Sequence, residues 1–219
     1  MSIILDGTTG ITTPSPLILT SAALGDSVAG ELEYDGTAPY FTPLGTQRGV
    51  IPGMQYYRLN STLTGSNAAS TQSPLGVGVT LSASTVYAFD GMYLLTKTAG
   101  TTSHTFSTIF GGTATFNNIA YRASAKFNTS SFTLASAADD YVIYPTASSA
   151  FGLIVVASAT TFTAVQLTGT VSVNAGGTFI PQYNLSAAPG GAYTTQSGSY
   201  FSIYPIGVAG SDINVGTWA

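Results

Sequence analysis

The chain has 219 residues, of which 44% are hydrophobic and only 6% are charged, against about 25% charged residues in ordinary soluble proteins. A surface this poor in charge favours contacts between protomers over a lone soluble monomer. Five basic residues against nine acidic ones cannot neutralise a run of phosphates, so we expect no nucleic-acid partner. The lack of cysteine excludes disulfides and thiolate sites.

Residues 1–25 form short apolar pieces separated by turns and prolines, a pattern that predicts an extended N-terminal arm. An arm this apolar is expected to dock on another surface. It has neither the basic leader nor the apolar stretch of a signal peptide, and the sequence contains no run of about 20 apolar residues. We therefore expect synthesis in the cytoplasm without a signal peptide, and no membrane partner.

Residues 26–49 predict a β-hairpin. In its first run, Leu32 and Tyr34 alternate with acidic residues, so one edge is apolar and the other solvated. Asp35-Gly36 supplies a turn, and Tyr40-Phe41 begins the return run. An isolated hairpin buries too little to be stable, so its apolar side should pack on the downstream domain or on copies of itself. The predicted oligomer and attachment residues are Val28, Leu32, Tyr34, Tyr40 and Phe41.

From residue 55 onward, strand-like runs alternate with turn residues, as in a β-sandwich, and no run has the periodicity of a capped helix. The sequence therefore predicts an all-β protein. Residues 1–50 are the expected attachment arm and stalk hairpin, and residues 51–219 the expected head, a jelly-roll-like antiparallel β-sandwich. The predicted head strands cover residues 55–60, 75–81, 86–97, 104–110, 115–126, 141–144, 151–157, 161–173, 178–186 and 200–206.

The clearest strand pair lies toward the C-terminus. Apolar residues alternate from Leu167 to Val173 and again from Phe179 to Tyr183, and residues 174–177 form a turn between them. This spacing predicts that the two strands pair as a hairpin. Trp218 is expected to help close the head.

Catalytic candidates are few. Gly25-Asp26-Ser27-Val28 resembles the nucleophile block of one serine-hydrolase family, but His104 is the only histidine and has no carboxylate within three positions. Asp139 and Asp140 are adjacent, and neighbours on a strand point in opposite directions, so we interpret them as a solvated loop and not as a glycosidase pair. We interpret His104 as an exposed strand-end residue; a ring of imidazoles about a threefold axis is the alternative. We predict no catalytic residue, no metal site and no cofactor.

Other polar residues suggest binding. Asp90 falls inside the predicted strand 86–97 and, if buried, needs a partner such as Arg58 or Arg122. Tyrosine combines a flat apolar ring with a hydroxyl, which suits sugar-binding and protein-binding surfaces. The predicted recognition surface consists of tyrosines beside Gly-rich loops, namely Tyr183, Tyr193, Tyr200 and Tyr204.

Two parts of the chain, residues 1–58 and 168–219, resemble tailed-bacteriophage fibre and virion surface proteins. The resemblance is carried by Gly30-Glu31-Leu32-Glu33-Tyr34-Asp35-Gly36-Thr37, Tyr40-Phe41-Thr42-Pro43, Gly45-Thr46-Gln47-Arg48-Gly49, Gly176-Gly177-Thr178-Phe179-Ile180-Pro181-Gln182-Tyr183 and Gly216-Thr217-Trp218-Ala219. It implies a trimeric stalk or collar followed by a β-sandwich head, in a protein of the tail fibre or spike type or of the head-fibre or decoration type.

This resemblance leads us to expect a non-enzymatic structural protein on the virion surface. It would be a short homotrimeric fibre-like or spike-like component, attached by its arm to other phage proteins of the tail, baseplate or capsid, with a head that recognises a host-surface polysaccharide. A capsid decoration or head-fibre protein that reinforces the shell is the alternative, because the chain is small and has no long shaft. A secreted carbohydrate-binding module is disfavoured by the missing signal peptide, and a glycan depolymerase by the scarcity of acids.

Overall fold

The computed structural model describes residues 18–132, 139–143 and 151–218, without the side chains of 139–143 and Phe151. The chain divides into two units, Met1–Ile51 with Val215–Ala219, and Pro52–Asn214. The described residues form sixteen β-strands and no helix, so the predicted all-β class is confirmed. Part of the predicted arm, residues 1–17, lies outside the described residues.

Residues 215–219, expected in the head, group with the N-terminal unit instead. A Cβ added to Gly216 would lie 3.7 Å from the carbonyl oxygen of Arg48, so the two backbones pack closely. The indole Nε1 of Trp218 donates to the Val215 carbonyl at 3.0 Å, within the same short segment. Trp218 therefore does not close the head, as the sequence analysis expected.

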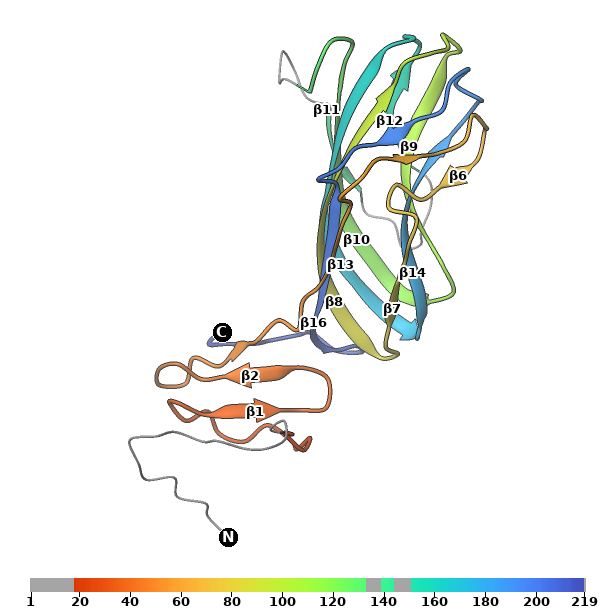
Figure 1. Cartoon of the computed structure of the whole chain (residues 1–219). Coiled ribbons are helices and arrows are strands. Elements are labelled where there is room, and N and C mark those ends of the chain that lie inside the picture. The colour runs from red at the N-terminus through yellow and green to blue at the C-terminus, as the bar shows by residue number, and fades with distance from the viewer. Residues whose placement is uncertain (1–17, 133–138, 144–150, 219) are drawn as a thin grey trace. The chain divides into compact units, whose positions relative to one another are not determined.

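The N-terminal unit contains a small antiparallel sheet in the order β1-β2-β3, with strands Leu32–Tyr34, Pro39–Phe41 and Gly49–Val50 (Figure 1). Asp35 organises the first turn, because its Oδ1 accepts the N–H groups of Thr37 at 2.7 Å and Ala38 at 2.8 Å. Gly36 follows with φ at 95°, a left-handed conformation that favours glycine. The predicted hairpin is confirmed, and β3 extends it by a strand that was not predicted.

The larger unit is a jelly roll made of four nested antiparallel pairs. These pairs are β7 (Val79–Leu81) with β14 (Gly177–Leu185), β8 (Thr85–Lys97) with β13 (Thr161–Ala175), β9 (His104–Gly111) with β12 (Phe151–Val156), and β10 (Thr115–Asn128) with β11 (Asp139–Ile143). Pairing of β9 with β14 and of β10 with β13 joins them into two sheets, β12-β9-β14-β7 and β11-β10-β13-β8. Figure 1 shows the sheets as two facing layers.

Further strands widen both sheets. β16 (Tyr200–Val208) pairs with the outer edge of β8, and β4 (Gln55–Arg58) pairs with β16. β15 (Thr194–Thr195) pairs with the far end of β8 and with β5 (Leu63–Thr64), while β6 (Thr71–Gln72) pairs with β14. Strand β8 therefore lies in the middle of the larger sheet, with β13 on one side and β16 and β15 on the other.

The hairpin predicted from residues 167–173 and 179–183 is wrong. Strands β13 and β14 follow each other in the chain but lie in opposite sheets, where β13 pairs with β8 and β10 and β14 pairs with β9. The alternation had identified the buried face correctly, since Leu167, Val171, Phe179 and Tyr183 are all buried. Alternation specifies which face of a strand is covered, and it does not specify which strand lies beside it.

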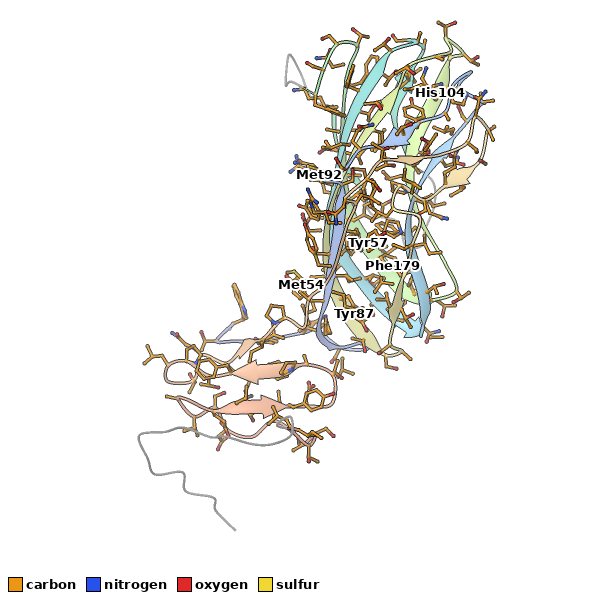
Figure 2. The ribbon with its side chains drawn as sticks, in the orientation of Figure 1. Met54, Tyr57, Tyr87, Met92, His104 and Phe179 are labelled. Carbon is orange, nitrogen blue, oxygen red and sulfur yellow. The ribbon has the colours of Figure 1, made fainter. Side chains whose placement is uncertain are left out.

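Aromatic rings fill the space between the two sheets. Phe110 of β9 stacks on Phe179 of β14 with ring centroids 4.6 Å apart. Across the core, the Phe110 ring packs edge-on against Phe89 of β8 and Tyr121 of β10, at 5.1 Å from each. Phe179 lies between the layers in Figure 2. Because each fully buried ring contributes about 1.5–3 kcal/mol, this cluster is a main source of adhesion between the sheets.

Lys97 ends β8 with its side chain buried. Its ammonium donates to the carbonyl oxygens of Gly100 at 2.6 Å, Ser158 at 2.6 Å and Ala99 at 3.1 Å. Burial lowers the pKa of Lys97 from its ordinary value. A buried ammonium needs such acceptors, and here they join the loop after β8 to the loop after β12.

Phe110→Ala should lower the free energy of unfolding by about 3–5 kcal/mol, because it removes a ring that contacts both sheets. Urea unfolding followed by circular dichroism measures the loss. Ile109→Ala is the matched control, since Ile109 is the neighbouring residue and is only half-buried; it should cost about 1 kcal/mol. Equal losses in the two variants would contradict the role of Phe110 at the centre of the core.

Candidate functional site

The small N-terminal sheet exposes an apolar pair. Leu32 and Phe41 are directly opposite each other in β1 and β2, so their side chains share one face. Leu32 is 47% exposed, Phe41 is 42% exposed, and Val28 in the preceding loop is 60% exposed. Among the described residues of this unit, the other exposed large apolar side chains are Ile18, Leu44, Ile51 and Trp218. Apolar side chains gathered in so small a unit are typical of a contact surface.

The opposite face of this sheet is held by polar contacts. Glu33 Oε2 binds Arg48 Nε at 2.7 Å, and its Oε1 accepts the Gly25 N–H at 3.0 Å. Arg48 Nη2 donates to the Gly25 carbonyl at 2.7 Å. Glu33 and Arg48 are mostly buried, so this charged pair fastens the loop before β1 to the sheet.

Tyr40 lies on this polar face. Adjacent strand residues point to opposite sides, so Tyr40 faces away from Phe41, and it is 3% exposed. Its hydroxyl donates to Asp35 Oδ2 at 3.0 Å, and burial together with this carboxylate raises the pKa of Tyr40 to about 12. The prediction that Tyr40 belongs to the exposed apolar side is therefore wrong.

The other predicted attachment residues lie where a partner could reach them. Val28, Leu32 and Phe41 are exposed, and Tyr34 is half-buried with its hydroxyl bonded to the Gly36 carbonyl at 3.0 Å. Their attachment role stays a prediction. Sequence reasoning did not identify Leu44 as an exposed apolar residue of this unit, because it lies in a loop without periodicity.

Two of the four predicted recognition tyrosines are core residues. Tyr183 is 2% exposed and stacks on Phe106 with centroids 5.2 Å apart, while its hydroxyl donates to Gln72 Oε1 at 3.0 Å. Tyr193 is fully buried and packs edge-on against Phe106 at 5.7 Å. Burial raises the pKa of both tyrosines. Their assignment to a surface is wrong, because Tyr183 continues the inward alternation of β14 and Tyr193 packs beside it.

His104 is also buried, so its interpretation as an exposed strand-end residue is wrong. Its Nδ1 lies 2.8 Å from the Thr102 carbonyl, which can only accept, so Nδ1 carries the hydrogen. Its Nε2 then accepts from the Tyr193 hydroxyl at 2.9 Å. Both ring nitrogens are occupied, which argues against an imidazole ring around a metal. Burial lowers the pKa of His104, although the hydrogen bond to Thr102 opposes this.

Tyr200 and Tyr204 are half-buried on the outer side of β16. The Tyr200 hydroxyl donates to Asp90 Oδ1 at 2.7 Å, and its ring stacks on Tyr56 with centroids 5.4 Å apart. The hydrogen bond to Asp90, partial burial and the Asp90 charge raise the pKa of Tyr200 to about 12. Asp90 is exposed and takes Tyr200 as its hydrogen-bond partner in place of the arginine that the sequence suggested.

Several grooves mark the larger unit, among them one of about 620 Å³ beside residues 210–213 and the two that follow. One, of about 390 Å³, lies on the outer face of the larger sheet and is lined by polar residues that include Asp90, Gln166 and Thr168. The other, of about 350 Å³, lies between edge strands β4 and β7 and is lined mainly by apolar residues that include Tyr57 and Val77. Sequence reasoning found neither groove, because each is built from strands far apart in the chain.

The catalytic candidates belong to different units of the chain. Ser27 belongs to the N-terminal unit, whereas His104 is occupied inside the jelly roll. Among the residues that the structure describes, no cluster of three or more His, Asp or Glu side chains could hold a metal ion. Asp139 and Asp140 begin strand β11, so their interpretation as a loop is wrong. Their side chains lie outside the described residues.

The described ranges contain no helix of the length and apolarity that a membrane crossing requires.

Comparison with known proteins adds little. No family model matches the chain, and no curated protein matches it. A solved structure of infectious bursal disease virus, Gx strain, is similar over 77% of this chain and 46% of that chain, with 11% identity and a TM-score of 0.17. The chain thus spans less than half the length of that protein. At this TM-score the similarity supports no conclusion about fold or function.

His104→Gln should make the protein less sensitive to acid. The unfolded His104 takes up a proton near pH 6.5, but the buried imidazole does so only at lower pH. Stability from the neutral imidazole is therefore fully present above pH 6.5 and is lost as the pH falls from there through the folded pKa. Melting temperatures measured between pH 7.5 and 5 should fall more steeply for the wild type than for the variant. Parallel curves would show that His104 does not contribute to acid sensitivity.

Proposed function

We propose that the chain is a non-enzymatic structural component of a tailed-bacteriophage virion. It is a short homotrimeric fibre-like or spike-like protein that attaches to other virion proteins through its N-terminal unit. The jelly roll is its outward head and recognises a host-surface polysaccharide. The head binds no cofactor and no nucleic acid.

The exposed Leu32–Phe41 pair carries this proposal. The polar face of the same sheet is already occupied by the Glu33–Arg48–Gly25 contacts, so the apolar face is the one that remains for a partner. A threefold arrangement of this unit would bury three such pairs against each other or against the particle. The low charge of the whole chain supports a protein that works in an assembly.

The jelly roll supports a binding role without specifying it. This architecture occurs in viral capsid and lectin domains, but a fold does not by itself determine function. The support for a non-enzymatic role comes from His104 and Lys97, whose polar groups are used to hold the core and loops together.

A capsid decoration or head-fibre protein is the second candidate. The described residues form one small sheet and one jelly roll, with no shaft-like element among them. A chain without a shaft-like element among its described residues suits a protein that reinforces a shell. In that version the N-terminal unit is the functional part and the head is secondary.

Electron microscopy of intact particles tests the proposal. A small gold-binding tag at one terminus locates the protein. Label on the tail or baseplate would support host recognition, and label spread over the shell would support decoration. Purified particles without label would overturn the virion role and favour a secreted carbohydrate-binding module.

Leu32→Asp should dissociate the trimer. The substitution buries an unpaired charge in the proposed contact and should raise the dissociation constant at least about tenfold. Sedimentation velocity of the full-length protein at low micromolar concentration measures the change.

Gln47→Asp is the matched control for Leu32→Asp. It adds the same charge to an exposed loop position of the same unit, outside strands β1 and β2, and should leave the trimer intact. A Leu32→Asp protein that remains as tight a trimer as the wild type would place assembly in the head.

A further inference from the structure

Two neighbouring rows of side chains cross strands β16, β8, β13 and β10 on the outer face of the larger sheet. The strand registers align Ser202, Asp90, Thr168 and Arg122 in one row, and Tyr200, Met92, Gln166 and Ser124 in the next. Alternate residues of a strand face the same side, so both rows point away from the core. Met92 is seen on this outer side in Figure 2.

These rows form the groove of about 390 Å³, since seven of the eight residues line it. Short side chains at Thr168 and Ser124 leave a hollow between the taller Arg122 and Tyr200. The volume falls within the range of about 300–1,000 Å³ that is typical of small-ligand sites. The floor is the middle of a sheet whose other face is packed core, so the lining residues are held on a rigid base.

Four polar groups of the groove have no hydrogen-bond partner among the described residues. Within the described part of the chain, Asp90 Oδ2, the Gln166 amide and the hydroxyls of Thr168 and Ser124 make no hydrogen bond. Asp90 Oδ1, by contrast, is fixed by the Tyr200 hydroxyl at 2.7 Å. The carboxylate is thus oriented in advance and keeps one oxygen to accept from a ligand.

An apolar border lies beside these polar groups. Tyr200 and Met92 are both half-buried, and the stacking of Tyr200 on Tyr56 limits its motion. A ring that is already fixed loses little conformational entropy when a ligand packs against it. The groove therefore offers hydrogen-bond acceptors and donors next to a preformed apolar surface.

This combination selects among ligand classes. A single guanidinium beside a carboxylate does not suit a polyphosphate. Among the residues whose side chains are described, Asp90 is the one carboxylate of the lining, and a divalent cation prefers several oxygen ligands. A sugar ring fits both parts, because its hydroxyls donate to a carboxylate and exchange hydrogen bonds with an amide, while its C–H face packs on an apolar surface.

We propose that this groove binds one saccharide unit of a host-surface polysaccharide, with Asp90 and Gln166 as the hydrogen-bonding residues and Tyr200 and Met92 as the apolar border. The inference rests on the recognition role proposed for the head and gives that role a location. It moves the recognition surface from the buried Tyr183 and Tyr193 to the outer face of the larger sheet.

Saturation-transfer NMR of the full-length protein with eight free monosaccharides tests this site. The probes are glucose, galactose, mannose, rhamnose, fucose, N-acetylglucosamine, N-acetylgalactosamine and N-acetylneuraminic acid. At least one should bind, and titration should show Asp90→Asn and Gln166→Ala each weakening its Kd at least about tenfold. Asp90→Asn keeps an oxygen for the Tyr200 hydroxyl, so the local fold is preserved.

Gln182→Ala is the matched control, because Gln182 lies on β14 in the opposite sheet and is half-buried; its Kd should equal that of the wild type. Binding that both groove variants leave unchanged would overturn the site, and so would a lack of binding to all eight sugars. A protein found on the particle that binds no sugar would overturn the groove alone. A sugar-binding protein absent from the particle would overturn the virion role and leave the groove in place.

Discussion

The stacking of Phe110 on Phe179, with Phe89 and Tyr121 packed against Phe110, is the contact on which the larger unit depends. The four rings come from both sheets, so they hold together layers that share few backbone hydrogen bonds. The nested pairing of the jelly roll brings these rings together between the sheets, because β8 and β10 lie in one sheet and β9 and β14 in the other. A packed interior in turn supports the outer sheet face from below.

The polar groups of the larger unit are divided between the margin of the core and the outer face of the larger sheet. Lys97 and His104 lie at the margin of the core. Lys97 donates hydrogen bonds to loop carbonyls, and His104 accepts one from the Tyr193 hydroxyl. Asp90 and Gln166 lie on the outer face, where the strands hold their backbones in place and both side chains are exposed. In a protein with only 6% charged residues, this exposed carboxylate, held by a tyrosine, is the group on which the proposed saccharide site is centred.

The N-terminal unit follows the same logic on a smaller scale. Its sheet is short and buries few apolar residues, chiefly Ala38 and Tyr40, so the Glu33–Arg48 pair and the Asp35 turn supply much of its order. Charged and hydrogen-bonded groups hold one face, which leaves Leu32 and Phe41 exposed on the other. A unit built this way is suited to bind something else through its apolar face.

The sequence by itself determined most local features. The alternation of apolar residues predicted the all-β class, the hairpin at Asp35-Gly36 and the inward faces of the long strands, because a period of two follows directly from extended backbone geometry. Only the tertiary structure decided which strands of the jelly roll pair. It separated β13 from β14, buried Tyr183, Tyr193 and His104, and aligned Asp90 with Thr168 and Arg122. Those outcomes depend on contacts between residues some 30 to 100 positions apart, which no local pattern of side chains encodes.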